Sequence, residues 1–71
     1  MNAETIRESL KRTPFEPIEL HMTSGEQHQS RRPENGWLAG SRLVLYYPES
    51  DRLDILSLLH IATIEMLKAA A

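Results

Sequence analysis

No cysteine occurs among the 71 residues of this chain. A domain of this length buries only a modest share of its surface, and proteins of this size commonly add disulfides, a metal site or self-association to a thin core. Disulfides and zinc sites built from thiolates are excluded, because both need cysteine sulfur. We therefore expect the chain to gain stability by associating with copies of itself.

The composition is that of one globular domain covering residues 1–71. Hydrophobic residues make up 41% of the sequence and charged residues 25%, which provides enough apolar side chains for a core and an ordinary polar surface. The formal net charge is −2. Proteins that grip phosphate backbones are usually basic, so this balance argues against broad nucleic-acid binding.

The first segment, residues 2–12, is predicted to be a helix. Asn2 can accept hydrogen bonds from the free amides of the first turn, and Ile6 and Leu10 lie four residues apart on one face. Pro14 ends the helix, because proline disfavours helical geometry in the residue before it. So short a helix is expected to be stable only when it is docked on the rest of the domain.

Residues 18–23 alternate apolar and polar side chains, which is typical of a half-buried strand. Gly25 then provides a turn into a second, polar segment. A two-residue turn would pair His21 with His28, whereas a three-residue turn with Gly25 in the left-handed conformation would place His28 opposite Leu20. We prefer the second register, although it places polar groups on the core face.

Residues 41–47 form the clearest predicted strand. Both of its faces are apolar, as expected for a strand at the centre of a sheet or in an interface. The second face would meet either another copy of the chain or the N-terminal helix. Before this strand, residues 32–36 are predicted as a loop, and Trp37 and Leu38 lead into a turn at residues 39–40.

The last segment, residues 51–67, allows two interpretations. Its propensities would suit a helix capped by Asp51, but its apolar positions surround the cylinder instead of forming one stripe. Two strands, roughly 52–58 and 61–67, with a tight corner near His60, account for the pattern equally well.

Four short motifs occur in order along the chain, at residues 14–21, 24–25, 32–34 and 58–65. In this order the chain resembles a family of short, uncharacterised bacterial proteins. Its members combine a helix, a Pro-Phe-x-Pro-Phe run, a glycine-turn hairpin, a His-Pro-Glu loop and a closing Leu-Leu-x-Ile-x-x-Ile-Glu. The chain departs from the pattern at Ile18, in place of the second phenylalanine, and at Arg32, in place of the loop histidine. The family has no assigned activity, so the resemblance implies a fold and not a function.

A short helix followed by short strands is also similar to the layout of Sm-like small barrels. Residues 60–64 faintly echo the end of the bacterial Sm-like RNA chaperones, but Leu58 and Leu59 stand where those proteins have tyrosine and lysine, so their RNA pocket would be incomplete here. The resemblance favours strands in the last segment. The expected fold is mainly β with one N-terminal α-helix, as a small SH3-like or Sm-like barrel or a strongly bent antiparallel sheet of about five strands, over residues 18–67.

Catalytic motifs are missing from the sequence, which has no Gly-x-Ser-x-Gly elbow, no phosphate-binding glycine loop and no His-Glu-x-x-His helix. So small a domain also leaves little room for a pocket that could shift the pKa of an acid or base. We therefore expect a protein that is not an enzyme and needs no cofactor.

A metal site would need the two-residue turn, because only that register brings His21 and His28 together with Glu19 on the same face. A solvated hairpin face is the simpler interpretation, and we expect no metal site. His60 is expected at the corner between two strands, with its ring hydrogen-bonded to the backbone.

Self-association has the strongest support, because the core is thin, residues 41–47 are apolar on both faces, and an open barrel leaves strand edges free to pair. The sequence therefore predicts a non-enzymatic binding or assembly module that forms a homo-oligomer or binds a protein partner. The residues expected at the interface are Val44, Tyr46, Ile61, Ile64 and Met66.

The alternative is an Sm-like RNA-binding protein. Arginine side chains would contact phosphates while aromatic rings stack on bases. Glu34 beside the arginine pair and the acidic net charge count against this role, and we rank it below self-association. The residues expected to contact RNA are Arg31, Arg32, Trp37 and Arg42.

The N-terminal residues show no basic run followed by an apolar stretch, so we expect a cytoplasmic protein without a signal peptide. The longest apolar region, residues 53–67, is interrupted by polar side chains. It is not expected to cross a membrane.

Overall fold

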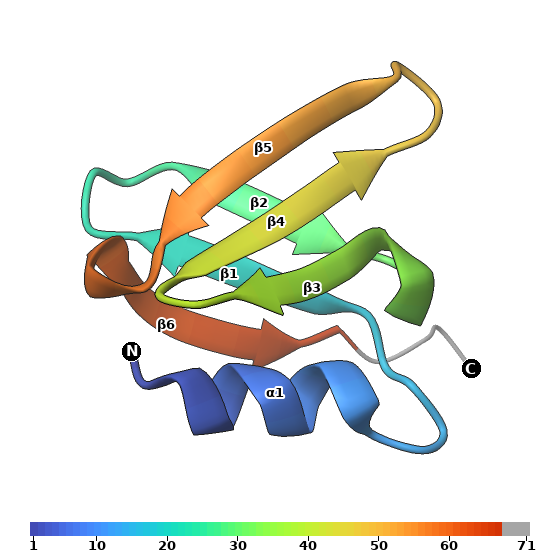
Figure 1. The fold of residues 1–71 in the computed structure, drawn as a ribbon, viewed down its shortest axis with the longest axis horizontal. Helices are drawn as coiled ribbons and strands as arrows, with labels where there is room; N and C mark the ends of the chain where they lie inside the picture. The colour runs from blue at the N-terminus through green and yellow to red at the C-terminus, as the bar shows by residue number, and fades with distance from the viewer. Residues whose placement is uncertain (68–71) are drawn as a thin grey trace.

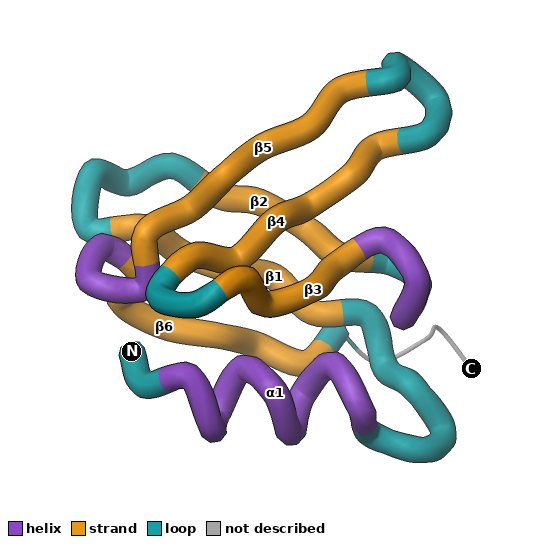
Figure 2. The backbone as a smooth tube through the Cα atoms, viewed as in Figure 1, coloured by secondary structure: helices purple, strands orange, loops and turns teal. Residues whose placement is uncertain are grey.

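Two three-stranded antiparallel sheets and one N-terminal helix make up the part of the chain that the computed structural model describes, residues 1–67 (Figures 1 and 2). The prediction of a mainly β fold with one N-terminal helix is therefore confirmed. The elements are α1 (Ala3–Lys11), β1 (Ile18–Met22), β2 (Gln27–Ser30), η1 (Pro33–Asn35), β3 (Gly36–Ala39), β4 (Arg42–Tyr47), β5 (Arg52–Ser57), η2 (Leu58–His60) and β6 (Ile61–Met66), where η marks a single turn of 3-10 helix.

The two sheets do not join into a closed barrel. Their strand orders are β2-β1-β6 and β3-β4-β5, so β2, β6, β3 and β5 are edge strands. Residues 1–67 contain six strands where about five were predicted, and the additional one is β3, which was expected to lead into a turn. Its four residues are too few to show an alternating pattern. They form a strand because they pair with β4, with Trp37 opposite Val44.

The helix α1 confirms the prediction for the N-terminal segment. The side chain of Asn2 caps it by accepting a hydrogen bond from the Thr5 amide at 2.9 Å. Ile6 is fully buried in the core between the sheets. The helix runs beside the edge strands β3 and β6 and so closes the seam between them (Figure 1). No helix in residues 1–67 is long and apolar enough to span a bilayer.

The hairpin of β1 and β2 has the preferred register. Leu20 pairs with His28, and the three-residue turn between the strands contains Gly25 at φ +94°. The turn is closed by a hydrogen bond from the Gly25 amide to the Met22 carbonyl oxygen at 2.9 Å. This register places His28 and the buried Ser30 on the inner face of the sheet, as predicted.

The last segment forms two strands and not a helix. The corner between β5 and β6 is η2, close to the predicted position. Strand β6 pairs with β1, where Leu20 lies opposite Ile64, so β1 is the central strand of its sheet. The apolar residues that would surround a helix are instead divided between strands of two different sheets.

The core lies between the inner faces of the two sheets. On β4 this inner face carries Leu43 and Leu45, both fully buried. Gly36 lies opposite Leu45, and a Cβ at this position would come within 3.0 Å of Ser30 Oγ and 3.2 Å of Leu10 Cδ2. Glycine therefore allows β3 to approach the helix closely. The core residues are Ile6, Leu20, Leu43, Leu45, Leu56, Leu58 and Ile61.

Candidate functional site

The outer face of sheet β3-β4-β5 is apolar and open to solvent. Cross-strand pairing places Trp37 and Ile55 on either side of Val44, and Leu53 beside Tyr46. The exposed fractions are 46% for Trp37, 53% for Leu53 and 60% for Ile55, whereas Val44 between them is only 9% exposed. We call these five residues the outer apolar face.

Charged residues border the outer apolar face at opposite ends of β4. Arg42 is exposed at the start of the strand. At the other end, the Tyr46 hydroxyl donates a hydrogen bond to Asp51 Oδ1 at 2.9 Å. This hydrogen bond, together with the negative charge of Asp51, raises the pKa of Tyr46 above its ordinary value of 10.0. The face therefore has a positive and a negative end.

Replacing Asp51 by asparagine is expected to lower the pKa of Tyr46 part of the way towards 10.0. The amide oxygen still accepts the hydrogen bond that is the larger cause of the raised pKa, but the negative charge that opposes ionisation of the phenol is removed. Asparagine also tolerates the φ of +51° at this position. The raised pKa means that the Tyr46 phenol stays protonated to a higher pH in the folded protein than in the unfolded chain. The contribution of the Tyr46–Asp51 pair to stability is therefore complete below pH 10, and it is lost as the pH rises through the folded-state pKa. Ultraviolet absorbance of tyrosinate during an alkaline titration measures the shift. An unchanged titration curve would contradict the assignment, and Glu49→Gln in the same turn is the control.

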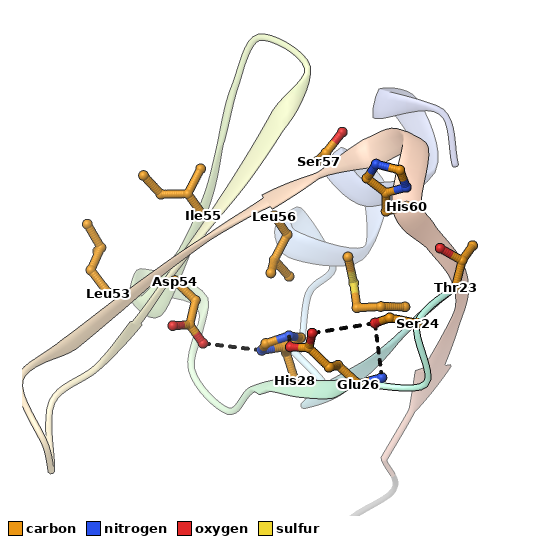
Figure 3. Close-up of a pocket in the computed structure, with 11 residues that line it drawn as sticks. Thr23, Ser24, Glu26, His28, Leu53, Asp54, Ile55, Leu56, Ser57 and His60 are labelled. Carbon is orange, nitrogen blue, oxygen red and sulfur yellow. Dashed lines mark hydrogen bonds and ion pairs between the residues drawn. The ribbon is translucent and has the colours of Figure 1, made fainter.

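An open seam between the edge strands β2 and β5 contains a cleft of about 760 Å³. Five consecutive residues of β5, residues 53–57, border it. Successive side chains of a strand point to opposite faces of the sheet, so a cleft on one face would be bordered by every second residue. Because all five residues border this cleft, it runs along the edge of β5. In Figure 3, Asp54 and Leu56 point from β5 towards His28 on β2, whereas Ile55 points away. The cleft is wide and open to solvent, so it is a surface groove between the two sheets and not an enclosed pocket.

His28 connects the two sheets across this open seam. Its Nδ1 lies 3.2 Å from Asp54 Oδ2, and its Nε2 lies 3.5 Å from Glu26 Oε2. The side chain is only 12% exposed. His60 borders the same cleft at the predicted corner, and its carbonyl oxygen accepts a hydrogen bond from the Thr23 amide at 2.8 Å. The backbone of His60, and not its ring, makes the hydrogen bond that holds this corner to the hairpin turn.

The residues predicted to form an interface fall into two groups. Val44 and Tyr46 belong to the outer apolar face. Ile61 is 3% exposed and lies in the core, while Ile64 and Met66 are half-buried on β6 and line a groove beside α1. The structure thus brings only the first two together in the outer apolar face.

The residues predicted to contact RNA are also divided. Trp37 and Arg42 lie on the outer face of sheet β3-β4-β5. Arg31 and Arg32 are exposed in the connection between β2 and η1, and Arg31 borders a small groove that also contains Tyr46. The four side chains therefore belong to two different parts of the surface.

Sequence reasoning missed Leu53 and Ile55 as members of the exposed face. Their alternation with Asp54 was the available signal, because it places both on the face opposite the carboxylate. Comparison of the chain with protein-family models, with curated proteins and with solved structures gave no match. The outer apolar face and the open seam are the features on which a functional proposal rests.

Proposed function

We propose that the chain is a non-enzymatic assembly module that associates with a second copy of itself through the outer apolar face. The observation that carries this proposal is the group of exposed apolar side chains, Trp37, Leu53 and Ile55, that surrounds the buried Val44 on three neighbouring strands. Single exposed hydrophobic residues are normal on monomeric proteins, but contiguous exposed apolar patches mark interaction sites. Association would bury this surface and supplement a thin core.

The charges around the face favour a second copy as the partner. Arg42 and Tyr46 are four residues apart on β4, which corresponds to about 13 Å along a strand. A two-fold axis passing near Val44 would place Arg42 of each copy over the Tyr46–Asp51 pair of the other. Such an interface is isologous, with an apolar centre and a charged, complementary rim.

The free edge of β5 adjoins this face and adds to the proposal. In residues 1–67 its only hydrogen-bonded neighbour is β4, so the other side of the strand offers unpaired amide and carbonyl groups. The strand contains no proline. Edge strands of this kind pair readily with another chain, which would extend sheet β3-β4-β5 between copies.

Replacing Leu53 by glutamate is expected to make the protein monomeric at concentrations where the unmodified chain is a dimer. Two carboxylates, one from each copy, would then be buried in the interface without partners. Light scattering across a concentration series measures the mass directly. Leu59→Glu is the matched control, because Leu59 is 85% exposed and lies outside the outer apolar face.

A chain that stays monomeric at high micromolar concentration would remove the assembly proposal, as would a Leu53→Glu variant that still forms dimers. The RNA-binding alternative is favoured by one observation, the shared groove of Arg31 and Tyr46. Salt-dependent binding of short single-stranded RNA by a chain that remains monomeric would therefore replace assembly with that function.

A further inference from the structure

A cluster of three side chains lies on the outer face of the other sheet, β2-β1-β6. Glu19 on β1 pairs directly with Glu65 on β6, and His21 follows two residues after Glu19 on the same face. One ligand atom from each residue lies within 4.8 Å of the other two. The three side chains lie on the side of the sheet opposite the core, because Glu19 and His21 alternate with the buried Leu20. None of them belongs to the outer apolar face.

The Nε2 atom of His21 is the centre of this cluster. It lies 3.0 Å from Glu19 Oε1 and 3.6 Å from Glu65 Oε1. It is inaccessible to solvent, and neither contact has the geometry of a hydrogen bond. A buried nitrogen without a hydrogen-bond partner costs free energy, so its position between two carboxylates needs a physical explanation.

We propose that Glu19, His21 and Glu65 bind a divalent zinc ion, with water as the fourth ligand. Zinc accepts imidazole nitrogen and carboxylate oxygen at about 2.0–2.2 Å and prefers tetrahedral geometry. Ligand atoms at tetrahedral positions around such an ion lie about 3.4 Å apart. The observed separations of 3.0 and 3.6 Å around His21 Nε2 lie on either side of this value.

Two further features suit a cation. Gln29 Nε2 donates a hydrogen bond to Glu19 Oε2 at 2.8 Å, which orients the carboxylate and leaves Oε1 directed to His21. Support of a ligand by a neighbouring hydrogen bond is common around metals. Within residues 1–67, the ion pairs of Glu19 and Glu65 involve only His21, so two negative charges share one imidazole.

His28 shows why this arrangement is specific to His21. It also has two carboxylates nearby, but Asp54 approaches Nδ1 and Glu26 approaches Nε2. The two ring nitrogens point in different directions, so those carboxylates do not converge on one point. At His21 both carboxylates face the same nitrogen, which is the arrangement that a single ion requires.

Calorimetric titration of the metal-free full chain with Zn²⁺ tests the proposal. We expect one ion per chain, and a loss of affinity of at least about 100-fold in His21→Gln and in Glu65→Gln, which remove ligands. Glu65 is mostly exposed, so its variant is expected to fold normally. Gln29→Leu removes only the support of Glu19 and is expected to weaken binding about tenfold. His60→Gln is the matched histidine control and should bind like the unmodified chain.

Mg²⁺ is expected not to compete, because it prefers octahedral oxygen ligands and retains its water. Absence of Zn²⁺ binding at millimolar concentration would overturn the proposal and leave His21 as an imidazole held between two carboxylates. Binding that persists in Glu65→Gln, or that is lost in His28→Gln instead, would also overturn it. The oligomeric state is measured separately, so failure here leaves the assembly proposal standing.

Discussion

Replacing Leu45 by alanine is expected to lower the free energy of unfolding by about 3 kcal/mol. The side chain is fully buried on the inner face of β4, where it packs against Gly36 and the rest of the core. A domain of this length has a total stability of about 4–11 kcal/mol, so the loss is a large fraction of what holds it folded. Urea denaturation at low protein concentration measures the change, and thermal unfolding should show a decrease in Tm of about 12–24 °C.

Leu53→Ala is the matched control, because it makes the same substitution on the neighbouring strand but on the outer face. At 53% exposure the side chain contributes little to the folded monomer, and the expected change is within about 0.5 kcal/mol. An equal decrease in the free energy of unfolding in the two variants would contradict the assignment of Leu45 to the core face and Leu53 to the exposed face of sheet β3-β4-β5.

Replacing Ile6 by alanine is expected to cost a similar amount, about 2–4 kcal/mol. Ile6 is the fully buried hydrophobic residue that joins α1 to the core. A nine-residue helix is not stable alone in water, so loss of its anchor weakens both the packing and the helix. Denaturant unfolding followed by circular dichroism reports both effects.

Glu8→Ala on the exposed side of α1 is the control for helix propensity, and its effect is expected to be small. If Ile6→Ala were no more harmful than Glu8→Ala, the helix would not be closing the seam between β3 and β6. Retention of the full helical signal in Ile6→Ala would lead to the same conclusion.

The local parts of the fold were predictable from the sequence. The register of the first hairpin follows from the positive φ available at Gly25, which places His28 opposite Leu20. The apolar pattern of the last segment suited a helix and two strands equally well, and the resemblance to Sm-like barrels favoured the two strands that the structure has. Only the hairpin register was predictable from residues that are neighbours in the sequence.

The parts of the fold that depend on distant pairing were not predictable. Strand β3 is defined by its ladder with β4 and not by its own four residues. Strand β4 carries apolar side chains on both faces, so its sequence does not show that Leu45 is in the core and Val44 on the outer side. The choice is made by the rest of the chain, which covers only one face.

The cluster of Glu19, His21 and Glu65 could not be predicted for the same physical reason. The sequence places Glu19 and His21 on one face of a strand, but the partner that it suggests for them is His28 in the adjacent segment. The third member, Glu65, reaches them only through the pairing of β1 with β6. A contact between residues this far apart in the sequence leaves no local pattern.

The pairing of β1 with β6 also affects the order in which the chain can fold. Strand β1 is near the start of the sequence, yet one of its two neighbours, β6, is the last strand in residues 1–67. Contacts of long sequence separation form slowly, because a long loop must be closed before they are gained. During synthesis, β1 therefore emerges long before its second partner exists. Until β6 is made, the growing chain exposes one edge of its central strand, which is when it is most open to misassociation.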